Sequence, residues 1–117
     1  MKGYREVKVT LSGKTVRCDP DPAVLYFNSG PDCLRFVFPG MPKEVDSVVI
    51  RWKDPSRPLF AGWGLAPSSV GSHLAEVITR GNNRVPGKYF YSVELLDAAG
   101  SVVAEADPGV ENQGDPP

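Results

Sequence analysis

The stretch KYFYSVELL, residues 88–96, decides the fold. Every second residue in it is apolar and of a type that is common in strands: Tyr89, Tyr91, Val93 and Leu95. Alternation with a period of two is typical of a half-buried β-strand, because successive side chains point to opposite faces of a sheet. The next four residues, Asp97-Ala98-Ala99-Gly100, predict a tight hairpin into another strand at residues 101–106.

Similar short patterns recur along the chain. Strands are expected at residues 5–12, 15–18, 23–28, 33–38 and 45–53, with turn residues between them. Residues 72–80 fit a strand, favoured by Val77-Ile78-Thr79, or else one short helix capped by Ser72. Twelve Gly and twelve Pro leave little room for long helices. The sequence therefore predicts an all-β fold, a two-layer antiparallel β-sandwich of about eight short strands.

The length of 117 residues suits one domain, which we expect to span residues 1–110. Residues 111–117 are expected to form a flexible C-terminal tail, because they carry little apolar surface. Residues 54–70 have the least regular pattern, and we interpret them as a long loop. Connections of this length in a compact domain usually carry function or pack over the core.

The charge balance argues against two classes of partner. Thirteen basic and fourteen acidic residues give a net charge of -1, so we expect no nucleic acid and no anionic membrane as a partner. The polar N-terminus has no apolar run of signal-peptide length, which predicts a cytoplasmic location. In that compartment Cys18 and Cys33 are expected to be reduced thiols rather than a disulfide.

Three segments carry a resemblance to a known group: Asp21-Pro22-Ala23-Val24, Gly87-Lys88-Tyr89-Phe90-Tyr91-Ser92-Val93 and Asp107-Pro108-Gly109-Val110-Glu111-Asn112. Together they resemble small bacterial β-sandwich proteins of cupredoxin-like or immunoglobulin-like shape. The resemblance implies that Tyr89 or Tyr91 hydrogen-bonds to backbone at a corner of the sandwich. A blue-copper site needs two histidines, and this chain has one, so we expect no copper and no other cofactor.

One group of residues has the composition of a binding surface. Basic and aromatic side chains that grip sugars or proteins gather around the predicted loop, and His73 follows it: Arg51, Trp52, Arg57, Phe60, Trp63 and His73. Lys53 and Arg80 add charge to this set. The competing interpretation places Trp52 in the core and uses Trp63 to pin the loop, because large aromatic side chains are mostly buried.

The main functional hypothesis is a non-enzymatic binding or structural module. It would act on a protein partner, or by self-association, through sheet edges and the 54–70 loop. A carbohydrate-binding or other ligand-binding module that displays Trp63 or Trp52 is one alternative. A small hydrolase that uses His73 with a nearby carboxylate is another, although no nucleophile motif accompanies His73 and we expect no enzyme.

Overall fold

The computed structural model describes residues 2–61, 69–70, 73–74 and 76–117. Within them lie thirteen β-strands and no helix, so none of the described residues belongs to a helix that could cross a bilayer. The all-β prediction is confirmed. Eight of the strands have four or more residues, close to the expected number.

The first sheet has four strands in the order β2 (Thr15–Asp19), β1 (Tyr4–Ser12), β4 (Cys33–Val37) and β9 (Val77–Ile78). β1 and β2 form an antiparallel hairpin around Gly13, whose φ of 63° is in the left-handed region that favours glycine. The turn expected between the strands at residues 5–12 and 15–18 is therefore present. β1 and β4 run parallel, which the antiparallel prediction did not include.

The second sheet is built around the long central strand β11 (Gly87–Leu96). β5 (Ser47–Trp52) pairs antiparallel with residues 91–96 of β11. β12 (Val102–Ala106) and β13 (Gly109–Gln113) also pair antiparallel with β11, at residues 93–96 and 87–90. β3 (Ala23–Tyr26) continues the sheet by pairing parallel with β13.

Short strands complete the fold. β6 (Phe60–Ala61) pairs with β10 (Arg80–Asn82), and β7 (Ser69–Val70) pairs with β8 (His73–Leu74). β8, β9 and the first residue of β10 lie in the region that fitted either a strand or a helix. Its described residues are extended as expected, but they form separate short strands in three sheets rather than a single strand. A bulge between Arg80 and Asn82 interrupts the pairing of β10.

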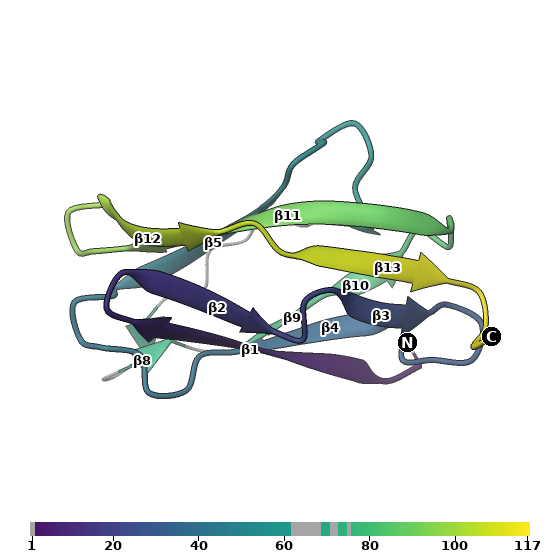
Figure 1. Ribbon diagram of the computed structural model, residues 1–117, viewed down its shortest axis with the longest axis horizontal. Coiled ribbons are helices and arrows are strands. Elements are labelled where there is room, and N and C mark those ends of the chain that lie inside the picture. The colour runs from purple at the N-terminus through teal and green to yellow at the C-terminus, as the bar shows by residue number, and fades with distance from the viewer. Residues whose placement is uncertain (1, 62–68, 71–72, 75) are drawn as a thin grey trace.

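The two sheets lie in separate layers, with β11, β12 and β13 in one and β1, β2 and β4 in the other (Figure 1). The inward side chains of both layers belong to a single apolar cluster. Phe36 of β4 and Tyr91 of β11 bridge the layers, with ring centroids 5.6 Å apart in an edge-to-face arrangement. The alternation in residues 88–96 is thus explained, since Tyr89, Tyr91, Val93 and Leu95 are all buried.

Two expectations need correction. The sandwich is not purely antiparallel, because the β1–β4 and β13–β3 pairs are parallel. The flexible tail does not begin at residue 111, because β13 runs to Gln113 between β11 and β3 and buries Asn112. The physical reason is that a strand with neighbours on both edges gains backbone hydrogen bonds that its own side chains do not reveal.

Candidate functional site

The aromatic residues proposed for a binding surface lie mainly inside the protein. Phe60 is only 2% exposed and belongs to the core, so its place on a surface was a wrong prediction. Trp52 is half-buried, and its ring contacts those of Phe60, Tyr89 and Tyr91 at centroid distances of 5.9 Å, 6.3 Å and 6.1 Å. Trp52 therefore caps the edge of the core rather than standing on an open face.

The other members of the proposed surface are scattered. Arg51 is exposed on β5 and pairs with Glu94 of β11 at 3.7 Å. Arg57 follows β5 and lies over the Tyr89 ring, with its guanidinium carbon 4.2 Å from the ring centroid. Trp63 and the side chain of His73 lie outside the described residues. Of the members that the structure describes, Trp52, Lys53 and Arg57 come together at one open site.

That site is a shallow depression of about 240 Å³ where β5 ends and β11 begins. We call it the Arg57 depression, and it is lined by Trp52, Lys53, Asp54, Arg57, Lys88, Tyr89 and Phe90. β5 pairs with β11 only from Tyr91 onward, and one further bond, from Lys53 N–H to Phe90 O (2.9 Å), extends this pairing. At Lys88 the hydrogen bond to β11 comes from a side chain instead of from the backbone, because Arg57 Nη1 donates to Lys88 O at 3.1 Å.

A tight turn holds Arg57 in this position. The Asp54 carboxylate accepts hydrogen bonds from the Ser56 hydroxyl at 2.6 Å and from the Ser56 N–H at 3.1 Å. These two bonds lower the pKa of Asp54, and the Arg57 charge adds to the effect. Arg57 N–H donates to Asp54 O at 3.1 Å, which closes the turn. The Asp54 carboxylate therefore stabilises this turn.

The cations around the depression differ in their partners. Lys53 Nζ lies 2.8 Å from Asp107, and this hydrogen bond raises the pKa of Lys53. Lys88 Nζ lies 4.0 Å from Glu111. Arg57 has no ion pair with any of the residues that the structure describes. Its guanidinium is therefore the charge best placed to meet an incoming group.

Phe90 is the surface residue that the sequence analysis missed. It lies on the outward face of β11 and is 55% exposed, the largest value among the large hydrophobic side chains whose exposure the structure describes. Its ring rests over Gly109 of β13, where an added Cβ would come within 3.3 Å. The signal was present in the sequence, because Phe90 occupies the outward phase of the alternation, where the next outward residues are Ser92 and Glu94.

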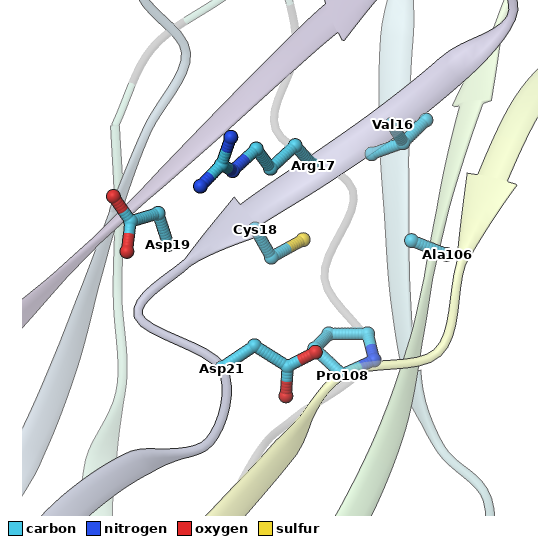
Figure 2. Close-up of a pocket in the computed structure, with 7 residues that line it drawn as sticks. All are labelled: Val16, Arg17, Cys18, Asp19, Asp21, Ala106 and Pro108. Carbon is cyan, nitrogen blue, oxygen red and sulfur yellow. The ribbon is translucent and has the colours of Figure 1, made fainter.

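A second depression, of about 340 Å³, lies at the seam between β2 and β12. Figure 2 shows the Cys18 thiol on the side of β2 that faces Ala106, with the Asp21 carboxylate beside Pro108. Burial raises the pKa of Cys18 to about 12, and the Asp21 charge adds to this. Asp21 accepts a hydrogen bond from the Gly109 N–H at 2.9 Å. A protonated thiol and a carboxylate engaged with backbone do not make an activated nucleophile.

The two cysteines are free and buried, and the sheet keeps them apart. β1 lies between them, since Cys18 of β2 pairs with Val9 and Cys33 of β4 pairs with Tyr4. Two strand spacings separate the cysteines across the sheet, roughly 10 Å, and five residues along β1 add roughly 16 Å. A disulfide needs Cα atoms within about 7 Å. The register therefore rules out a bridge between Cys18 and Cys33 within this fold.

The remaining chemistry gives no metal centre in the described part of the chain. There, no group of three or more His, Cys, Asp or Glu side chains is arranged to hold a metal ion. The Tyr89 hydroxyl donates to Val85 O at 2.8 Å, a bond to the backbone four residues upstream. Compared with protein families, curated proteins and solved structures, the chain matches none of them.

Proposed function

We propose that this chain is a non-enzymatic binding module whose contact surface is the Arg57 depression together with Phe90. The observation that carries the proposal is an aromatic side chain, 55% exposed, at the rim of a depression that also holds Arg57. Aromatic and arginine side chains are enriched among the residues that dominate binding energy in protein interfaces. The partner we propose is a protein segment that presents an apolar side chain beside a carboxylate.

The surroundings support this choice of partner. Arg57 is held by a cation–π contact with Tyr89 and by one hydrogen bond to Lys88, so its position is fixed before binding. A preorganised side chain loses less conformational entropy when a ligand arrives. The guanidinium has five N–H donors, and a carboxylate can accept two of them side by side. Phe90 would supply the apolar contact next to that pair.

The carbohydrate-binding alternative draws less support from Trp52 than an exposed ring would give. Trp52 is half-buried and packs against Phe60, Tyr89 and Tyr91. Trp63 lies outside the described residues, as does the His73 side chain on which the hydrolase alternative depends. Neither alternative is favoured by a feature of the described residues.

Selection from a displayed library of random peptides tests the proposal. We expect the chain to enrich acidic-aromatic or acidic-aliphatic peptides whose affinity falls tenfold or more in Phe90→Ala and in Arg57→Ala. Val102→Ala is the matched control, because Val102 is similarly exposed but lies on β12, away from the depression. Sedimentation at rising protein concentration examines self-association with the same variants. The proposal fails if neither peptide binding nor self-association depends on Phe90 or Arg57.

A further inference from the structure

A third depression, of about 480 Å³, lies apart from the Arg57 depression. We call it the arginine pocket, and its walls are Asp32, Cys33, Arg80, Gly81, Asn82 and Arg84. Nearby contacts place it at the end of the sandwich where both chain ends lie (Figure 1), since Lys2 N–H donates to Asp32 at 2.7 Å and Asn28 donates to Asp115 at 3.1 Å. The volume is in the range of small-molecule sites.

One wall of the arginine pocket is held rigidly by side-chain amides. Asn82 Nδ2 donates to Asp32 O and to Asn112 Oδ1, each at 2.9 Å. Asn82 Oδ1 accepts from Asn112 Nδ2 at 2.9 Å and from Arg84 N–H at 2.8 Å. All four hydrogen-bonding positions of this amide are therefore filled. The backbone from Gly81 to Arg84 is thus fixed relative to β4 and β13.

Arg84 is placed in the pocket at a cost in backbone energy. Its φ is 59°, and it is the one non-glycine residue with a positive φ among those that the structure describes. Its guanidinium lies over the Phe27 ring at 5.5 Å and donates to Phe27 O at 3.2 Å and to Asn28 Oδ1 at 3.0 Å. These bonds use two of its five N–H donors. Arg84 also lines the pocket, and these two bonds leave three of its N–H donors for a ligand.

Arg80 supplies a second guanidinium to the same pocket. It is exposed, and its side chain makes no hydrogen bond or ion pair with any of the residues that the structure describes. Asp32 places one negative charge in the wall, and its Oδ1 is engaged by the Lys2 N–H and, at 3.3 Å, by the Cys33 thiol. Two cations against one anion leave the pocket positive.

We propose that the arginine pocket binds an oxyanion, the phosphate or carboxylate group of a small molecule. The guanidinium is planar and carries paired N–H donors that match such oxygens in geometry and charge. Arg84 is the preorganised donor, and Arg80, whose side chain has no partner among the described residues, is the second donor to the ligand. This site is independent of the Arg57 depression, so either proposal can fail without the other.

The test is a titration of the isotope-labelled full chain, followed by the backbone N–H signals in NMR. Sodium phosphate and sodium acetate are the two probes, each added to ~50 mM with sodium chloride balancing the ionic strength, because salt screens weak surface attraction. We expect saturable shifts confined to residues 32–33 and 80–84. The ratio of the two dissociation constants identifies which oxyanion the site prefers.

Four variants make the result specific. Arg80→Gln and Arg84→Gly should each weaken binding about tenfold, the loss expected for one charge-assisted hydrogen bond. Glycine at position 84 also suits a positive φ, so this variant should fold well. Asp32→Asn keeps an acceptor for the Lys2 N–H and removes the opposing charge, so it should strengthen binding several-fold. Arg51→Gln, on β5, is the control and should change nothing.

The following results would overturn the oxyanion proposal. If neither anion produces saturable shifts at residues 80–84, the pocket has no oxyanion site. Shifts that spread over the exposed lysines and arginines of the whole chain, or that survive unchanged in both Arg80→Gln and Arg84→Gly, would show general charge screening instead. A spectrum of each variant without added anion establishes that the fold is intact.

Discussion

The side-chain amides of Asn82 and Asn112 form a reciprocal pair in which each Nδ2 donates to the other Oδ1 at 2.9 Å. Asn112 is 1% exposed, and its amide also donates to Val85 O at 3.1 Å. The pair joins β10 to β13 across 30 residues of sequence. It therefore fixes the chain that carries Arg80 and Arg84 onto the end of the second sheet.

The first prediction concerns this pair. Asn112→Ala should lower the free energy of unfolding by about 2 to 3 kcal/mol, because it removes a buried amide and leaves the half-buried amide of Asn82 without one donor and one acceptor partner. Urea unfolding measures the change. Gln113→Ala, on the same strand and half-buried, is the control and should cost about 0.5 kcal/mol or less.

A double-mutant cycle that combines Asn112→Ala with Asn82→Ala measures the interaction between the two amides apart from their contacts with other groups. The two substitutions together should cost less than the sum of the single losses, with a coupling of at least about 0.5 kcal/mol. Strict additivity would contradict the interpretation that each amide satisfies the other.

The second prediction concerns Gly87, where β11 approaches Arg57. Its φ is 149°, and a Cβ added there would collide with Arg57 Nη2. The guanidinium is the flexible end of its side chain, so in Gly87→Ala it should swing away and lose its contacts with Tyr89 and Lys88. We expect a loss of roughly 1 to 2 kcal/mol, from backbone strain and these contacts together.

Gly100→Ala is the matched control for Gly87→Ala. Gly100 also has a positive φ, of 82°, but no atom lies within 4 Å of an added Cβ. Both substitutions are then measured in an Arg57→Ala background. The cost of Gly87→Ala should shrink there, whereas that of Gly100→Ala should stay the same. Equal costs of Gly87→Ala in the two backgrounds would disprove the contact between position 87 and Arg57.

A third prediction concerns the Tyr89 hydroxyl, which donates to Val85 O at 2.8 Å and accepts from Asn83 Nδ2 at 3.0 Å. Tyr89→Phe should cost about 1 kcal/mol, a modest loss because Val85 O still accepts from Asn112 and Asn83 still donates to Pro58 O. Thermal unfolding measures it. Tyr4→Phe, at an exposed position, should leave the midpoint almost unchanged; a similar shift in both variants would count against the bond.

The strands that the sequence predicted best are those whose two faces differ. Residues 88–96 alternate because one face meets the core and the other does not, and the structure buries the predicted side. β13 was missed because it contains only one large apolar residue, Val110. Its stability comes from its position between β11 and β3, and such a position is not encoded in a local pattern.

The candidate sites show the same limit. Composition pointed to Arg57 and Trp52 but also to Phe60, because a list of basic and aromatic residues does not say which way each side chain faces. The parallel pairing of β1 with β4 and of β13 with β3 joins segments far apart in the sequence. The arginine pocket likewise brings together residues that are far apart in the sequence, since Asp32 and Arg80 both line it. Gly81-Asn82-Asn83-Arg84 has residue types common in turns, and its part in a pocket could not be seen from the sequence.

The fourth prediction concerns pH. Burial raises the pKa of Cys18 from its ordinary value of 9.0 to about 12, and burial and the Asp32 hydrogen bond raise that of Cys33 to about 11. In the unfolded chain both thiols lose their protons at lower pH than in the folded protein. The folded state then binds more protons, so stability is fully present below pH 9 and falls as the pH rises through the folded pKa values.

Urea unfolding at pH 8, 9 and 10, with a reducing agent present, measures this fall. Above pH 9 each buried thiol should contribute up to about 1.4 kcal/mol of lost stability per pH unit. Cys18→Ala removes one titrating group and should flatten the dependence, although it also lowers stability at pH 8 because it loses packing. Tyr91, whose pKa is raised by its burial and by the nearby Cys18 and Asp21, adds to the slope only above pH 10, which sets the upper limit of the window. An identical slope in the wild-type chain and in Cys18→Ala would mean that Cys18 is not held protonated in the seam between β2 and β12.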